Sequence, residues 1–137
     1  MPEIIVSLAA SLLAAGAAWV TNGLVIPAIG KRGIAFLTPL VEELAKTLTA
    51  ISLGAALLWT HVLFGVLEAL VEIKRRGTKG LAPGGAALVS HSIFGLLTAW
   101  LYGRSGILPA LAAAYLAHAT WNGAVVACNS HRKSRLD

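Results

Sequence analysis

The fold is decided by the stretch Thr38-Pro39-Leu40-Val41-Glu42-Glu43-Leu44-Ala45-Lys46, which lies inside a long apolar segment. Its three ionisable residues, Glu42, Glu43 and Lys46, would stand near the middle of a helix that crosses a membrane. Each such side chain costs about 2.5–3.5 kcal/mol near the bilayer centre on insertion scales. We therefore expect all three to face protein or trapped water, inside a bundle of helices.

The composition of the whole chain indicates the same class. Of its 137 residues, 57% are hydrophobic and 12% are charged, whereas soluble domains contain roughly 25% charged residues. The apolar runs have lengths that suit a hydrocarbon core of about 30 Å. The first run continues past Val25, which disfavours a cleaved signal peptide. We expect one domain over residues 1–137, a multi-pass protein of the cell membrane in contact with lipid.

The apolar runs and their breaks predict an all-α fold, a polytopic bundle of about five transmembrane helices. The predicted helices are Glu3–Ile29, Ile34–Ser52, Ala55–Ile73, Pro83–Tyr102 and Pro109–Asn129. Glycines, several of them beside basic residues, mark the breaks between the runs. Pro39 has no N–H to donate to the preceding turn, so we expect a kink just before the acidic pair.

The basic residues predict the orientation of the bundle. With the C-terminus inside, the inner loops and the tail hold nine Lys and Arg, and the outer loops hold only Arg104. This asymmetry favours an N-out, C-in topology. The basic residues lie just outside the apolar runs, where they set topology and contact anionic lipid. They form no basic face with interleaved aromatic residues, so we expect no nucleic-acid partner.

Polar side chains on four predicted helices fall at a similar depth. Counted from the cytoplasmic helix ends at 1.5 Å per residue, Glu42 and Glu43 lie about 12–15 Å deep and Glu68 about 8–10 Å deep. His91 and His118 fall in the same slab, which is less than about 10 Å thick. We therefore expect these groups to share one pocket toward the cytoplasmic side.

Two local spacings add residues to this pocket. Lys46 follows Glu42 by four residues and Glu43 by three, so it can reach either carboxylate. Asn122 follows His118 by four residues and shares its helix face. We expect His61, which belongs to no motif, to be structural.

This set of residues is sufficient for peptide-bond hydrolysis. A carboxylate can take a proton from water, and His or Asn donors can stabilise the oxyanion. Alternatively, Glu68, His91 and His118 could hold a divalent metal such as Zn²⁺, since three such ligands plus water form a common catalytic site. The chain has no His-Glu-x-x-His motif, and its spacings leave both mechanisms open.

Four short motifs follow one another on successive predicted helices: Glu42-Glu43-x-x-Lys46, Phe64-x-x-x-Glu68, His91 and His118-x-x-x-Asn122. In this order they resemble the motifs of the PrsW-type intramembrane proteases. They are similar, more distantly, to those of the CAAX-processing and bacteriocin-immunity membrane proteases. The resemblance covers roughly residues 39–122.

The resemblance implies roles for these residues. Glu42 would be the water-activating base, with Glu43 and Lys46 as its supporting pair. The other site residues would be a second-motif carboxylate, a histidine that completes the polar site and two oxyanion donors: Glu68, His91, His118 and Asn122. Phe64 and Trp121 would support the site. The chain departs from the PrsW pattern at Ala69, where Asn is expected, and it is shorter than those proteases. Oligomerisation would be one way to close its site.

We expect an intramembrane endopeptidase that cuts membrane-protein or lipidated peptide substrates near the cytoplasmic face. One alternative is a small proton-coupled transporter or channel, in which the same acids and imidazoles relay protons. Another is a non-catalytic membrane assembly or immunity factor, in which the polar residues only fix helix packing. We predict no repeated half-motif of the kind that transporters contain, which disfavours the first alternative.

Overall fold

The structure is a computed structural model that describes residues 2–133, without the side chains of Val25 and residues 131–133. Five α-helices are present, and the described residues contain no strand. Their bounds are α1 Glu3–Ile29, α2 Thr38–Leu53, α3 Leu57–Arg76, α4 Leu81–Ser105 and α5 Ile107–Lys133. The all-helical prediction is confirmed, and the predicted bounds of α1 agree with the structure.

A π-helical segment, Gly33–Leu37, lies before the acidic pair, where we predicted a kink, and it leads directly into α2. Pro39 lies in the first turn of α2, where its missing N–H is tolerated. The N–H of Thr38 donates to the carbonyl of Gly33, five residues back. This wider turn precedes the site and rotates the residues that follow relative to a regular α-helix.

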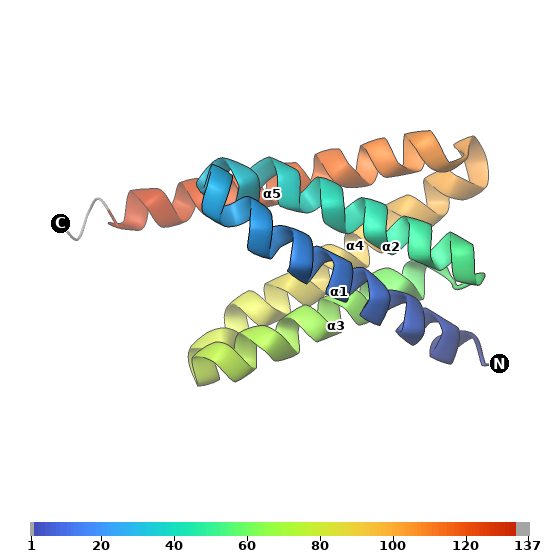
Figure 1. The fold of residues 1–137 in the computed structure, drawn as a ribbon, viewed down its shortest axis with the longest axis horizontal. Helices are drawn as coiled ribbons and strands as arrows, with labels where there is room; N and C mark the ends of the chain where they lie inside the picture. Colours follow the sequence, from blue (N-terminus) through green and yellow to red (C-terminus); the bar gives the residue numbers. More distant parts are fainter. Residues whose placement is uncertain (1, 134–137) are drawn as a thin grey trace.

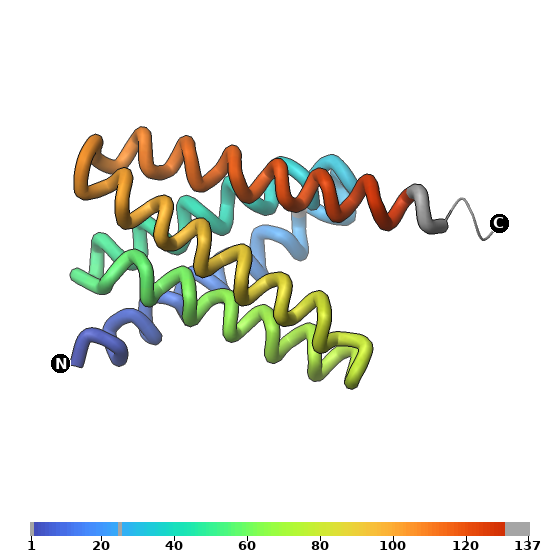
Figure 2. The backbone as a smooth tube through the Cα atoms, turned by 180° about the vertical axis from the view of Figure 1, so that it is seen from behind, coloured from blue at the N-terminus to red at the C-terminus, as the bar shows by residue number. Residues whose placement is uncertain are grey.

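Successive helices run in opposite directions (Figures 1 and 2), and their contacts close a ring. Around the ring, α1 packs against α2, α2 against α5, α5 against α4, α4 against α3, and α3 against α1. The contact between α2 and α3 crosses the interior. The ammonium of Lys31 donates to the hydroxyl of Ser130 over 3.0 Å. The loop before α2 therefore lies beside the C-terminal part of α5, at the end of the bundle that also contains the α3–α4 turn.

The interior of the ring is polar and its exterior is apolar. The largest side chains that are fully buried in the described part of the chain are Lys46, His61, His91 and Glu43. The buried apolar residues are alanines and two phenylalanines. Large apolar side chains face outward instead; Trp19, for example, is 80% exposed. This distribution is the reverse of that in a water-soluble domain.

Among the described residues, only α1 passes a test of length and apolar composition for crossing a membrane. A signal sequence or the core helix of a soluble protein passes the same test. The buried ionisable residues lower the apolar character of α2 and α3, and the π segment shortens α2 to 16 residues.

Helices α3 and α4 contain a repeated motif, which corrects our prediction that no half-motif is repeated. Residues 60–69 read THVLFGVLEA and residues 90–99 read SHSIFGLLTA, with five identical positions in ten. A Cβ on Gly65 would lie 3.0 Å from the Cβ of His91, and a Cβ on Gly95 would lie 2.6 Å from the Cβ of His61. Each histidine thus packs against the glycine of the other helix. The repeat is present in the sequence itself, and the structure shows its meaning, which is the reciprocal packing of the two histidines and the two glycines.

Candidate functional site

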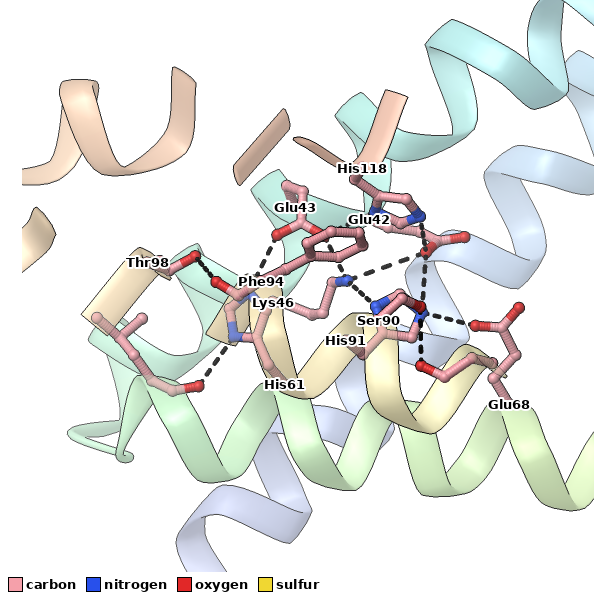
Figure 3. Close-up of polar contacts among 12 residues, drawn as sticks. Glu42, Glu43, Lys46, His61, Glu68, Ser90, His91, Phe94, Thr98 and His118 are labelled. Carbon is pink, nitrogen blue, oxygen red and sulfur yellow. Dashed lines mark hydrogen bonds and ion pairs between the residues drawn. The ribbon is translucent and has the colours of Figure 1, made fainter. Parts of the chain in front are cut away.

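Seven residues from α2, α3, α4 and α5 meet inside the ring (Figure 3). We call this set the polar cluster: Glu42, Glu43, Lys46, His61, Glu68, His91 and His118. The predicted convergence of acids and imidazoles is thus present in the structure. Helical spacing accounts for much of it, since Glu43 and Lys46 lie one turn apart on α2 and His61 and Glu68 lie two turns apart on α3.

Glu43 is the most connected member of the polar cluster, and it is fully buried. Its Oε1 accepts from the ammonium of Lys46 at 2.6 Å and from Nδ1 of His118 at 2.8 Å. Its Oε2 lies 3.0 Å from Nε2 of His61. Three donors on three helices therefore fix both oxygens of this carboxylate.

Lys46 is buried completely and lies between α2 and α4. Besides Glu43, its ammonium lies 3.0 Å from Nδ1 of His91 and 4.0 Å from Oε2 of Glu42. It also lies 4.4 Å from the centre of the Phe64 ring, within the range of a cation–π contact. The predicted reach of Lys46 to both carboxylates is present, and Glu43 is the closer partner.

Glu68 and His91 form the open side of the polar cluster. Nε2 of His91 lies 2.6 Å from Oε2 of Glu68. The side chain of Glu68 is 45% exposed, whereas that of His91 is 2% exposed. An ammonium has only donors, so Nδ1 of His91 accepts from Lys46. The hydrogen of a neutral His91 is then on Nε2, which donates to Glu68.

Glu42 lies at the centre of a set of nitrogens without a short contact to any of them. Its Oε2 is 4.0 Å from Lys46 Nζ, 4.0 Å from His91 Nε2 and 3.9 Å from His118 Nε2. Its Oε1 lies 3.5 Å from the amide nitrogen of Asn22, on α1. Because Glu43 accepts from Nδ1 of His118, Nε2 of a neutral His118 has a lone pair directed at the Glu42 side.

Among the described residues, Glu42, His91 and His118 each offer one possible ligand atom for a metal, and these three atoms lie within 4.8 Å of one another. Tetrahedral zinc with bonds of about 2.0–2.1 Å needs its ligand atoms about 3.3–3.4 Å apart. The separations of 3.9–4.0 Å are wider than this. In addition, Nε2 of His91 carries a hydrogen while Lys46 donates to Nδ1. The arrangement therefore does not fit tetrahedral zinc.

The same spacing fits a water molecule. A water oxygen about 2.8 Å from each partner can bridge two acceptors that lie 3.9 Å apart. Oε2 of Glu42 and Nε2 of His118 are both acceptors, and one water has two hydrogens to donate. Phe94 covers one side of this part of the polar cluster, because its ring stacks on His118 with 4.9 Å between ring centres.

Two predicted site residues have other surroundings. The amide of Asn122 donates to the carbonyl of Ile34 in the π segment, over 3.2 Å, so it holds α5 against the start of α2. Trp121 is 43% exposed on the outer surface of α5 and does not reach the polar cluster. Because Asn122 follows His118 by one helical turn, both lie on the same face of α5. The contacts of each residue on that face depend on the helix that packs against it. For Trp121, the exterior position agrees with its large apolar ring.

Two partners of the acidic pair were not predicted from the sequence. His61, which we expected to be structural, is bonded to Glu43, and the only signal for it was its spacing of seven residues before Glu68. Asn22 donates to Glu42 from α1, a helix that we had assigned no site residue. Phe94 was also missed; it becomes visible only as the repeat counterpart of Phe64.

No protein-family model, curated protein or solved structure matches the chain. The functional assignment therefore depends on the chemistry of the polar cluster.

Proposed function

We propose that the five helices cross the cell membrane, with the N-terminus outside and the C-terminus inside. The reversed distribution of side chains supports this, because lipid rather than water favours an exterior of large apolar residues. Leu108, Leu24 and Trp19 are each more than 70% exposed. Removing an apolar surface from water gains about 25 cal/mol of free energy per Å². For the exterior of a single chain, this gain requires contact with lipid or with other chains.

The positions of the charges support the orientation. The α1–α2 loop, the end of α3 and the end of α5 lie at one end of the bundle, and the end of α4 lies at the other (Figure 1). The first three carry basic residues, whereas the last turn of α4 carries Arg104. Under the positive-inside rule the first end faces the cytoplasm. Glu68, the exposed member of the polar cluster, lies on the half of α3 nearer to this end.

We propose further that the protein is an intramembrane endopeptidase in which Glu42 activates water. The observation that supports this most strongly is the separation of 3.9 Å between Oε2 of Glu42 and Nε2 of His118. These two acceptors can hold one water and leave its lone pair free to attack. The ordered motifs that resemble PrsW-type proteases support the same activity.

In the proposed reaction, Glu42 takes a proton from the water while the water oxygen bonds to the carbonyl carbon of the scissile peptide. The carbonyl oxygen becomes an oxyanion. The Nε2–H of His91 leaves its hydrogen bond to Glu68 and donates to this oxyanion instead. The C–N bond then breaks, and the proton on Glu42 passes to the leaving amine. The products are a carboxylic acid and an amine, so atoms and charges balance.

This scheme assigns the oxyanion differently from the resemblance. The resemblance implies that His118 and Asn122 are the oxyanion donors. In the proposed reaction Nε2 of His118 is an acceptor, because Glu43 binds the hydrogen on Nδ1. The one amide contact of Asn122 is with the π segment. The donor is then His91, whose Nε2–H already points to an exposed carboxylate.

The test uses purified protein in proteoliposomes with a mixture of synthetic single-span peptides. Mass spectrometry of the peptides should show cleavage by the wild type and none by Glu42→Gln, because the amide cannot accept the proton. Glu72→Gln is the matched control: Glu72 is on α3 outside the polar cluster and pairs with the exposed Arg76, so cleavage should remain. Cleavage by a folded Glu42→Gln protein would refute the role of Glu42.

One observation favours a second function, a small proton-coupled transporter or channel. Antiparallel repeats with buried ionisable side chains at their interface are common in transporters, and α3 and α4 contain such a repeat. This function predicts proton flux into vesicles loaded with a pH-sensitive dye, without cleavage products. Flux that is lost in Glu42→Gln, with no cleavage by the wild type, would favour it over hydrolysis.

A further inference from the structure

His61 occupies a sealed position at the contact between α3 and α4. It is fully buried, and the absence of a side chain on Gly95 provides the space for its ring. In the repeat it is the counterpart of His91, which lies against Gly65 in the same way. The two histidines also use the same atom, since Nε2 of each faces a glutamate: Glu43 for His61 and Glu68 for His91.

Both ring nitrogens of His61 face acceptors. Nδ1 lies 2.8 Å from the carbonyl oxygen of Leu57, and Nε2 lies 3.0 Å from Oε2 of Glu43. A neutral imidazole has a single N–H and can satisfy only one of these contacts. Oε1 of Glu43 already accepts from Lys46 and His118, an arrangement that suits the ionised carboxylate. The hydrogen between Glu43 and His61 therefore belongs to the ring.

We propose that His61 is a positioning residue: the Nε2–H of its imidazolium ring donates to Oε2 of Glu43, fixes the plane of that carboxylate and thereby directs Nε2 of His118 at Glu42. His61 holds Oε2, so Oε1 stays in place for the Nδ1–H of His118. The ring also supplies a second cation beside Lys46 in a cluster with three carboxylates. The repeat thus yields two His–Glu pairs, one sealed for positioning and one open toward substrate.

Nitrogen-15 NMR of the histidine rings in the purified wild-type protein tests the charge directly. The signal pair that disappears in His61→Gln should have both nitrogens protonated, and His118 should be protonated at Nδ1 alone. A His61 ring with one unprotonated nitrogen would overturn the proposal. This measurement needs no substrate and no folded variant beyond the one used for assignment.

A matched pair of variants tests the positioning role through cleavage of the single-span peptides, a readout that rests on the proposed function. The Gln amide of His61→Gln can reach the position of Nε2 and donate to Glu43, whereas that of His61→Asn reaches only the position of Nδ1. We expect His61→Asn to lower kcat by about 10- to 100-fold with KM unchanged, because a small misplacement of catalytic groups has an effect of this size, and His61→Gln to stay close to the wild type. Equal losses in both variants would overturn the proposal.

Two glycine variants on α4 separate positioning from general destabilisation. Gly95→Ala pushes on His61, whereas an added Cβ at Gly85 meets nothing within 4 Å. We expect Gly95→Ala to lower kcat and to shift the ring signals of His61, with Gly85→Ala unchanged in both. Unshifted His61 signals in Gly95→Ala would contradict the proposal. If even the wild type cleaves no peptide, the proposed hydrolase fails, while the NMR result still decides the state of His61.

Discussion

Replacing Glu43 with Gln removes the negative charge that three buried donors share. The amide keeps one acceptor oxygen and places an NH₂ group where a second carboxylate oxygen accepted a hydrogen bond. Lys46 is then left without its 2.6 Å partner, and its next carboxylate oxygen lies 4.0 Å away. Breaking a buried ion pair by removing one partner costs about 3–5 kcal/mol. We expect Glu43→Gln to lower the free energy of unfolding by that amount.

Glu68→Gln is the comparison, because it also removes one carboxylate charge from the polar cluster. The side chain of Glu68 is 45% exposed and has one short contact, with His91. The expected loss is about 1 kcal/mol, the net value of one hydrogen bond that solvent can replace. Unfolding in bicelles by titration with SDS, followed by tryptophan fluorescence, measures both variants.

A double variant separates the unpaired charge from the lost bonds. Adding Lys46→Met to Glu43→Gln removes the ammonium as well, and an apolar replacement of a buried pair can recover roughly 1–4 kcal/mol. We therefore expect the double variant to be more stable than Glu43→Gln. If Glu43→Gln and Glu68→Gln are equally stable, or if Lys46→Met adds to the loss, the buried pair does not have the energy assigned to it.

The chelator EDTA should leave peptide cleavage unchanged, because the separations of 3.9–4.0 Å around Glu42 and the hydrogen on His91 do not fit zinc; loss of cleavage, restored by Zn²⁺, would reverse this reading. Cys128 is exposed near the end of α5, so a membrane-impermeant maleimide should label it only from the cytoplasmic side. In a Cys128→Ser background, Gly103→Cys should be labelled only from outside, and the opposite pattern would invert the proposed topology. Gly80→Ala should lower the free energy of unfolding by about 1–3 kcal/mol, because its Cβ would overlap the carbonyl of Glu72; a thermal unfolding midpoint equal to that of Gly85→Ala would show that the α3–α4 turn relaxes freely.

The helices were predictable because each depends on a local signal. Apolar length, glycine breaks and basic flanks place all five within a few residues of the structure. Helix α4 begins at Leu81 rather than at Pro83, since proline is tolerated in a first turn. Helix α5 continues to Lys133, beyond the predicted Asn129, because the polar residues there continue the helix past the apolar run.

The level of the site residues along the bundle was predictable, but the directions of their side chains were not. A rise of 1.5 Å per residue gives the level of Glu42, Glu68, His91 and His118, and the structure brings these four together. The rotation of each helix about its axis depends on its neighbours, which single-helix spacing does not contain. The contact of His61 with Glu43 joins residues 18 positions apart, and it requires the close approach that Gly95 permits.

The contact of Asn22 with Glu42 could not be predicted from the sequence for the same reason. It joins α1 to α2 across 20 residues, and no motif connects the two positions. The repeat in α3 and α4 was available in the sequence, but its significance comes from the reciprocal packing of His61 and His91 against glycines.

Single-turnover cleavage in ¹⁸O-labelled water tests most directly whether Glu42 activates a water molecule. With enzyme in excess over a single-span peptide, the account predicts one ¹⁸O atom in the new carboxyl group of the product during the first turnover, and no product from Glu42→Gln. Unlabelled product in the first turnover, with ¹⁸O appearing later in Glu42, would contradict the account, because it would make that carboxylate the nucleophile instead of the base.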